Sequence, residues 1–91
     1  MTTTKLQPIL TNQKSFYNKA IINTTKDTKD LISYKTKMAT IKNGKLIYLN
    51  KNKNNYTQTT LKHLKDFLYQ EINMKDLTKK DILKMMKDLN K

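Results

Sequence analysis

The sequence predicts an α+β domain in which a small three-stranded antiparallel β-meander precedes two C-terminal helices, in the order β-β-β-α-α. Three observations predict this class. Stretches rich in aromatic and β-branched residues lie before residue 50. An Asn43-Gly44 pair separates two apolar stretches, which is the strongest short-range signal for a β-hairpin. After residue 57, apolar residues recur with the period of an amphipathic helix.

The first fourteen residues are polar apart from a short apolar island, Leu6 to Leu10, which Pro8 interrupts. We expect residues 1–14 to form an extended arm that either packs Ile9 and Leu10 on the domain edge or is disordered. Residues 15–91 then form a single α+β domain, because a chain of this length supplies one core.

Three strands are expected in the first half of the domain. Residues 15–24 form the first strand, and a turn over 26–30 leads into a longer strand over 31–42. Residues 45–50 form the third strand, after the Asn43-Gly44 turn.

A two-residue turn fixes the register of the last two strands. It places Ile41 opposite Leu46 and Ala39 opposite Tyr48, so that these four residues share one face of the sheet. The other face is then lined by Met38, Thr40, Ile47 and Leu49.

Two helices follow a polar, flexible loop over 51–55. The first is expected over about 60–73, with Leu61, Leu64, Leu68 and Ile72 on one face and N-cap candidates at Thr57, Thr59 and Thr60. The second is expected over 79–89, because Thr78 and Asp81 have the spacing of a capping box.

The net charge of +12 is unevenly distributed, and all nineteen basic residues are lysines. Residues 1–65 hold thirteen lysines and two acids, whereas residues 66–91 hold six lysines and five acids. Lysine is a hydrated point charge without the forked geometry with which arginine reads guanine. The composition therefore predicts sequence-tolerant contacts with a polyanion.

The candidate binding residues lie on the predicted strands and their turns. The basic face is expected to comprise Lys19, Lys26, Lys35, Lys37, Lys42, Lys45, Lys51 and Lys53. The candidates for stacking on nucleobases are Tyr17, Tyr34, Tyr48 and Tyr56, although each is also a candidate for the half-buried side of a strand.

The sequence does not predict an enzyme. His63, the only histidine, is expected near the surface at the start of a helix, and Asp66 is expected to pair with Lys62 on the helix surface. There is no cysteine and only one glycine, which excludes thiolate metal sites and glycine-rich phosphate loops. We therefore expect no catalytic residues, no metal and no cofactor.

The chain is expected to be cytoplasmic and not to associate with membranes. It lacks cysteine, an N-terminal apolar leader and an apolar stretch long enough to span a bilayer. Leucine, isoleucine and phenylalanine total only 21 residues, with no valine, so the core is lean. A homodimer is therefore an alternative to a monomer.

Three segments of the chain are distinctive together: SFYNKA at 15–20, LISYKTKMA at 31–39, and YTQTTLKH at 56–63 followed by Phe67-Leu68. This pattern resembles a family of small uncharacterised proteins from phages and mobile elements of low-GC Gram-positive bacteria. The resemblance covers about residues 15–70 and assigns no role to any residue. It implies a protein that modulates host machinery, for example as an inhibitor of CRISPR nucleases, or that serves phage replication or transcription.

Three functions follow as hypotheses. The first is a non-enzymatic accessory protein that binds and inhibits a host nucleoprotein, in the manner of an anti-CRISPR protein, in the cytoplasm of a host bacterial cell. The second is a sequence-tolerant protein that binds DNA or RNA directly. The third is a structural or scaffold module whose charge serves solubility only.

Overall fold

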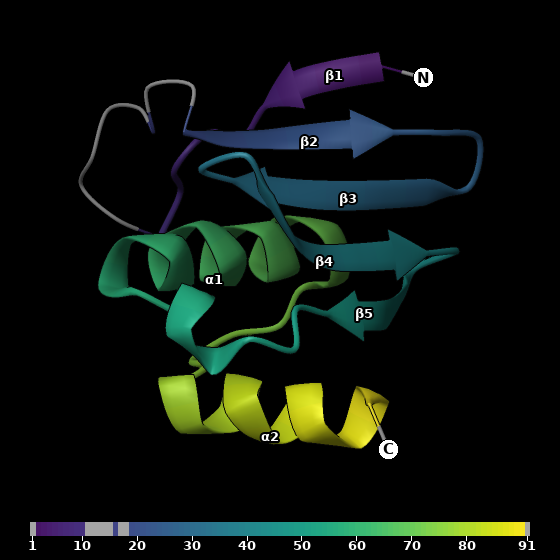
Figure 1. Ribbon diagram of the computed structural model, residues 1–91. Helices are drawn as coiled ribbons and strands as arrows, with labels where there is room; N and C mark the ends of the chain where they lie inside the picture. The colour runs from purple at the N-terminus through teal and green to yellow at the C-terminus, as the bar shows by residue number, and fades with distance from the viewer. Residues whose placement is uncertain (1, 11–15, 17–18, 91) are drawn as a thin grey trace.

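The computed structural model describes residues 2–10, 16 and 19–90, and its described part has an α+β fold (Figure 1). Five strands form one antiparallel sheet in the order β1-β2-β3-β4-β5. Helix α1 packs on one face of this sheet, and α2 lies beyond β5 (Figure 1). The elements are β1 (Thr2–Lys5), β2 (Ala20–Thr24), β3 (Thr28–Ser33), β4 (Thr36–Lys42), β5 (Lys45–Leu49), the 3₁₀ helix η1 (Lys53–Asn55), α1 (Gln58–Ile72) and α2 (Lys79–Leu89).

The prediction of a three-stranded meander is wrong, although the α+β class and the order of strands before helices hold. The strand expected over 31–42 is two strands, β3 and β4, joined by a tight turn at Tyr34-Lys35. The expected arm also begins with a strand, because residues 2–5 pair with β2 as β1. The expected first strand is described as β2 from residue 20 onward, and residues 15, 17 and 18 lie outside the described part.

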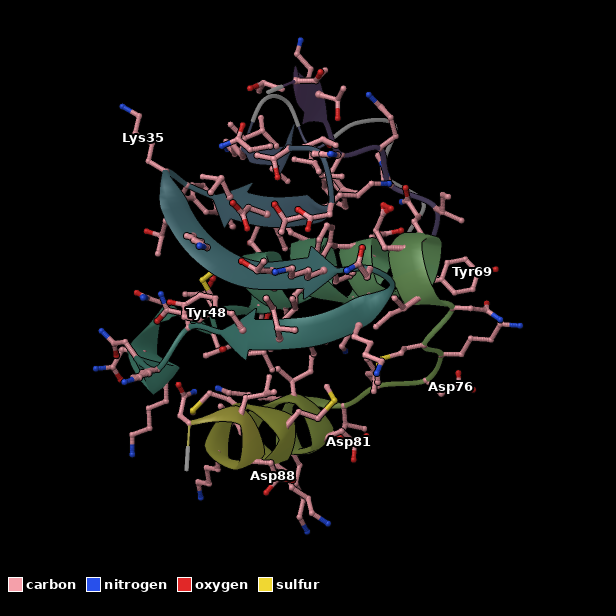
Figure 2. All side chains as sticks on the ribbon, turned by 90° about the vertical axis from the view of Figure 1, so that its right-hand side faces the viewer. Lys35, Tyr48, Tyr69, Asp76, Asp81 and Asp88 are labelled. Carbon is pink, nitrogen blue, oxygen red and sulfur yellow. The ribbon has the colours of Figure 1, made fainter. Side chains whose placement is uncertain are left out.

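The sheet contains two hairpins with the same two-residue turn. Ser33 pairs with Thr36, so Tyr34 and Lys35 form the turn, with φ angles of 49° and 67°. At the β4–β5 turn Asn43 and Gly44 have φ angles of 51° and 77°, which confirms the predicted hairpin. Left-handed backbone costs roughly 1 kcal/mol per residue for ordinary side chains. Lys35 lies at the tip of its turn and projects from the body of the protein (Figure 2).

Two β-bulges decide which side chains point away from α1. Leu31 pairs with Ala39 and Ile32 pairs with Lys37, so Met38 is an extra residue in β4. The bulge places Lys37 on the opposite face from Ala39, although strict alternation would put both on one face.

The second bulge corrects the predicted register of β4 and β5. Ile41 faces Leu46 as predicted, but Tyr48 pairs with Thr40 rather than Ala39, because Ile47 is an extra residue in β5. Tyr48 therefore shares a face with Thr40. Leu49 pairs with Ala39 instead, and both are buried.

Both helices begin at side-chain caps. The Thr57 hydroxyl accepts the Thr60 N–H at 3.2 Å at the start of α1, and α1 ends at Asn73, which has a φ angle of 57°. At the start of α2, Thr78 and Asp81 form the reciprocal capping box that the sequence predicts. Helix α2 has the predicted bounds, and α1 begins two residues earlier than expected.

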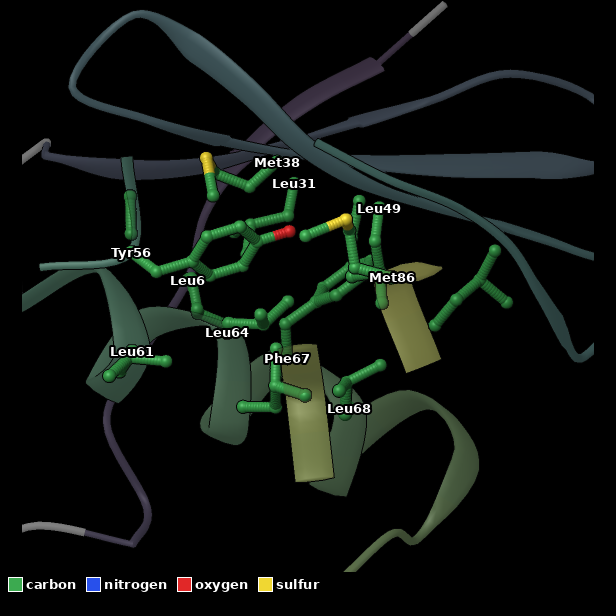
Figure 3. Close-up of a cluster of buried hydrophobic side chains, with 14 of the residues drawn as sticks. Leu6, Leu31, Met38, Leu49, Tyr56, Leu61, Leu64, Phe67, Leu68 and Met86 are labelled. Carbon is green, nitrogen blue, oxygen red and sulfur yellow. The ribbon is translucent and has the colours of Figure 1, made fainter. Parts of the chain in front are cut away.

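The core lies between the sheet, α1 and α2 (Figure 3). Leu31 and Leu49 from the sheet meet Leu64 and Phe67 from α1, and all four are fully buried. Tyr56 also lies within this cluster (Figure 3). Helix α2 adds a smaller contribution, mainly through Ile82 and Met86.

The residues after β1 cross α1 and are fixed there by Asp66. Leu6 is buried, and one Asp66 carboxylate oxygen accepts the N–H groups of Ile9 and Leu10 at 2.8 and 3.0 Å. The Gln70 side chain adds a hydrogen bond, at 2.6 Å, to the carbonyl of Gln7. We call residues 6–10 the strap. Asp66 is therefore fully buried, which corrects the expectation of a surface ion pair.

Candidate nucleic-acid interface

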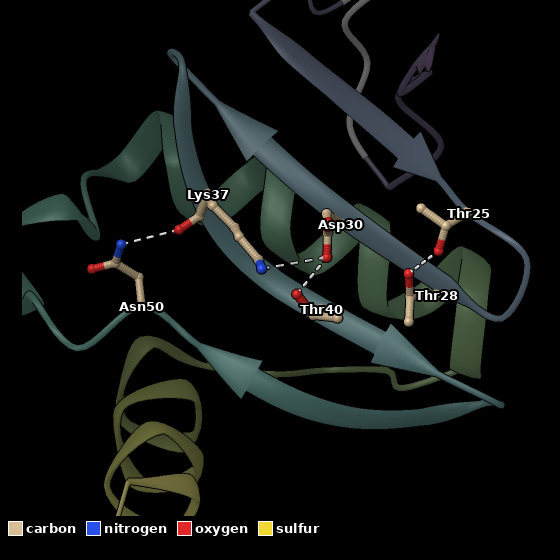
Figure 4. Close-up of polar contacts among 6 residues, drawn as sticks. All are labelled: Thr25, Thr28, Asp30, Lys37, Thr40 and Asn50. Carbon is tan, nitrogen blue, oxygen red and sulfur yellow. Dashed lines mark hydrogen bonds and ion pairs between the residues drawn. The ribbon is translucent and has the colours of Figure 1, made fainter. Parts of the chain in front are cut away.

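One face of the sheet is not covered by α1, and we call it the open face. Residues that pair across neighbouring strands point to the same side of a sheet, so the strand register defines this face. It consists of Thr3, Lys5, Ile21, Asn23, Thr28, Asp30, Ile32, Lys37, Thr40, Lys42, Lys45 and Tyr48. Figure 4 looks onto this face, with α1 behind the sheet.

The open face is basic because it carries four lysines and only one acid, Asp30, which already contacts Thr40 and Lys37. Asp30 accepts a hydrogen bond from the Thr40 hydroxyl, and the Lys37 ammonium lies 3.8 Å from the same carboxylate oxygen (Figure 4). Four lysines of this face, Lys5, Lys37, Lys42 and Lys45, are exposed. The face therefore presents a clear excess of positive charge, which attracts polyanions.

The edge strand β5 adds an aromatic ring to the open face. Tyr48 is half-buried, and the Lys37 ammonium lies 5.2 Å from its ring centroid. Ile21 of β2 and Ile32 of β3 pair with each other on the same face and are also half-buried. An aromatic ring beside lysines is the arrangement with which proteins hold nucleic acids without reading their sequence.

The structure divides the eight predicted lysines among three places, and all eight are exposed. Lys37, Lys42 and Lys45 lie on the open face. Lys26 lies in the β2–β3 turn, beside the Asn43-Gly44 turn. The other four lie at the opposite end of the sheet, before β2, in the β3–β4 turn and after β5: Lys19, Lys35, Lys51 and Lys53. The sequence prediction missed Lys5, because a polar Thr-Thr-Thr-Lys segment carries no apolar signal for a strand.

The four candidate tyrosines have different environments. Tyr34 is 47% exposed at the β3–β4 turn, and Tyr48 is half-buried on the open face. Tyr56 is buried, and its hydroxyl donates a hydrogen bond to the Asn50 carbonyl at 2.7 Å. Burial, and next the neighbouring Tyr48, raise the pKa of Tyr56 to about 12. Tyr56 is thus a core residue rather than a stacking residue, and Tyr17 lies outside the described residues.

A polar cluster lies inside the core beneath the β3–β4 turn. The Ser33 hydroxyl lies 2.8 Å from Nδ1 of His63 and 3.1 Å from the Thr60 hydroxyl. All three residues are buried, which corrects the expected surface position of His63. Burial lowers the pKa of His63, the Asp66 charge opposes this effect, and the Lys19 charge adds to it. The cluster joins β3 to α1 in the interior.

The described residues contain no group of three or more histidine, aspartate or glutamate side chains that could hold a metal ion. Neither described helix combines the length and the apolar character that crossing a bilayer requires.

A second surface lies away from the open face, where the end of α1, the α1–α2 loop and the strap meet. It is a shallow groove of about 470 Å³, lined by Leu10, Lys65, Tyr69, Met74, Lys75, Asp76 and Leu77. Tyr69 and Asp76 are on the far side of the protein from Tyr48 and Lys35 (Figure 2). Four of its seven lining residues are apolar or aromatic: Leu10, Tyr69, Met74 and Leu77.

Comparisons with known proteins give one match. The model of a family described as "Family of unknown function (DUF8033)" matches residues 4–84. No curated protein and no solved structure matches the chain.

Proposed function

The chain belongs to the family of unknown function DUF8033, and on the basis of its own surface we propose that it is a non-enzymatic protein that binds nucleic acid through the open face. The contacts to the phosphate backbone are made by Lys5, Lys42 and Lys45, while Lys37 offsets the charge of Asp30. The binding does not depend on the nucleotide sequence and needs no cofactor. It takes place in the cytoplasm of a bacterial cell.

The observation that carries this proposal is the state of Asp30. An acid in the middle of a basic face would repel phosphates, but Thr40 and Lys37 both contact this carboxylate. The remaining lysines lie toward the two ends of the face, where a backbone crossing the strands would meet them. Ammonium groups that neutralise phosphates release condensed counterions, which makes such binding strongly dependent on salt.

A second candidate function is favoured by the groove at Tyr69 and Met74. The groove combines Leu10, Met74 and Leu77 with the Tyr69 ring, and an apolar groove that includes an adaptable methionine suits a protein partner. In this alternative the open face contacts the nucleic acid of a host nucleoprotein and the groove contacts its protein component. The result is inhibition, as the resemblance to phage and mobile-element proteins implies.

The test compares two variants with the same change of charge. The first replaces Lys5, Lys37, Lys42 and Lys45 by glutamine, and the control replaces four exposed lysines of α2, namely Lys79, Lys80, Lys84 and Lys87. Binding to duplex DNA is measured across a range of salt concentrations. The three phosphate contacts of Lys5, Lys42 and Lys45 predict that the slope of log K against log salt falls by about 2.7 in magnitude for the first variant.

The control should keep most of the affinity. Equal losses in both variants would mean that net charge alone matters and would contradict a role for the open face. Weak binding of the wild-type protein to free nucleic acid, together with a salt-resistant complex with a host nucleoprotein, would favour the second candidate function.

A further inference from the structure

Adjacent hairpins of the sheet use the same turn with different residues. The β4–β5 turn has Asn43-Gly44, the pair that a turn with two positive φ angles favours. The β3–β4 turn has Tyr34-Lys35 in the same left-handed conformation. Neither tyrosine nor lysine is favoured there, because a bulky side chain at positive φ is uncommon. The backbone therefore does not explain the choice of these residues.

Disfavoured backbone conformations are kept where the side chains serve a function. The turn is held firmly, since the Tyr34 N–H donates to the Lys19 carbonyl at 2.9 Å. It also lies at the edge of the protein, where Lys35 points into solvent (Figure 2). The structure thus anchors the backbone of Tyr34 and leaves its aromatic ring partly exposed.

Contacts inside the protein cover only part of the Tyr34 side chain. Its centroid lies 5.8 Å from that of the buried His63 ring, in a tilted arrangement. Phe16 contacts the same imidazole more closely, at 4.5 Å, and is itself buried. A residue whose role was to cover His63 would be buried like Phe16, but Tyr34 remains 47% exposed.

The surroundings of the exposed part of the ring are basic. The Lys19 ammonium lies 5.7 Å from the Tyr34 ring centroid, and Lys35 is the next residue in the turn. The ligand that matches an exposed ring with one ammonium group beside it and a second lysine next in the chain is a nucleobase with its neighbouring phosphates. Bases within a duplex are stacked on each other and cannot reach a ring at a hairpin tip, whereas unpaired bases can.

We propose that Tyr34 stacks on an unpaired nucleobase, and that Lys19 and Lys35 hold the adjoining phosphates, so that this turn makes the protein prefer single-stranded nucleic acid. The inference rests on the proposed binding of nucleic acid and adds to it a residue that discriminates single strands from duplexes. The open face binds the backbone of either form, and the turn contributes only to single strands.

The experiment uses three variants of Tyr34 and three probes of equal length, namely single-stranded DNA, single-stranded RNA and duplex DNA of mixed sequence. Tyr34→Asn should weaken binding to single strands by about 5- to 150-fold, the range that loss of one stacked base gives. It should change duplex binding by less than about twofold. Because asparagine tolerates positive φ, this variant should be at least as resistant to urea as the wild type. Tyr34→Phe should bind single strands like the wild type, since the ring is retained.

The chain has no tryptophan, so Tyr34→Trp provides a single fluorescent reporter at the turn. Its emission should be quenched by single strands and not by the duplex. Unchanged single-strand affinity in Tyr34→Asn, or unquenched emission in Tyr34→Trp, would overturn this inference while leaving the proposed function intact. A wild-type protein that binds none of the three probes would overturn both.

Discussion

The Oγ atom of Ser33, at the end of β3, lies 2.8 Å from Nδ1 of His63 in α1, and this contact joins the sheet to the helix inside the core. Phe16 packs edge-on against the same imidazole, with 4.5 Å between the ring centroids. The environment is thus suited to a neutral histidine, because the loss of hydration that lowers the pKa of His63 outweighs the opposing charge of Asp66, and Lys19 adds to it.

We predict that the protein loses stability when the pH falls below about 6.5, the ordinary pKa of histidine. Burial lowers the pKa of His63 in the folded protein, so the unfolded chain binds a proton that the folded chain does not. The free energy of unfolding should then fall by up to about 1.4 kcal/mol per pH unit in this range. Urea titrations between pH 5 and 8 measure it. His63→Gln should have a flatter profile, and an identical slope in both proteins would contradict the assignment to His63.

Replacing Asp66 by alanine should destabilise the protein more than replacing it by asparagine. Asp66→Ala leaves the N–H groups of Ile9 and Leu10 without their acceptor, at a cost of about 1–3 kcal/mol for each group that water cannot reach. Asp66→Asn retains one carbonyl oxygen for both. Urea unfolding compares the two variants, and amide hydrogen exchange at Ile9 and Leu10 shows whether the strap is released. Similar losses in both variants would show that the charge, rather than the acceptor, matters.

Alkaline titration should reveal one late-ionising tyrosine. Burial raises the pKa of Tyr56 to about 12, so its contribution to stability is complete below pH 10 and is lost as the pH rises toward 12. Absorbance at 295 nm follows tyrosinate formation, and the late step should vanish in Tyr56→Phe. The same variant should lose roughly 1 kcal/mol at neutral pH, because the Asn50 carbonyl loses its donor. If the late ionisation step persists in Tyr56→Phe, it belongs to another tyrosine.

The capping box of α2 should stabilise the protein measurably. Thr78→Ala removes the acceptor for the Asp81 N–H and should cost about 1 kcal/mol. Thermal unfolding followed by circular dichroism measures the effect. Lys80→Ala, in the same exposed turn but outside the capping box, is the matched control and should be close to neutral. A larger loss in the control than in Thr78→Ala would contradict the role of the cap.

The helices were predictable because their signals are local. Apolar residues repeat along α1, and Thr57 and Thr78 mark the helix starts within a few residues of chain. The number of strands was not predictable in this way, because Tyr34-Lys35 is not a pair that marks turns and β1 is wholly polar. In both places pairing with neighbouring strands overrides local preference.

The candidate site was only partly predictable for a related reason. The lysines of β4 and β5 could be selected as candidate binding residues from the charge distribution and the Asn43-Gly44 turn signal. Assigning them to a face requires the extra residues Met38 and Ile47, which leave no mark in the sequence. The buried position of His63 and Asp66 depends on Ser33 and on the strap, which are 30 or more residues away in the chain.

The hydrogen bonds between Asp66 and the strap set an order of events during synthesis. Ile9 precedes Asp66 by 57 residues, so the ribosome releases the strap long before its anchor exists. Contacts between such distant parts of a chain form slowly, because a large loop has to close first. Until α1 has emerged, Leu6 has no helix to pack against. Docking of the strap onto α1 is therefore a late event, which follows synthesis of Gln58–Ile72.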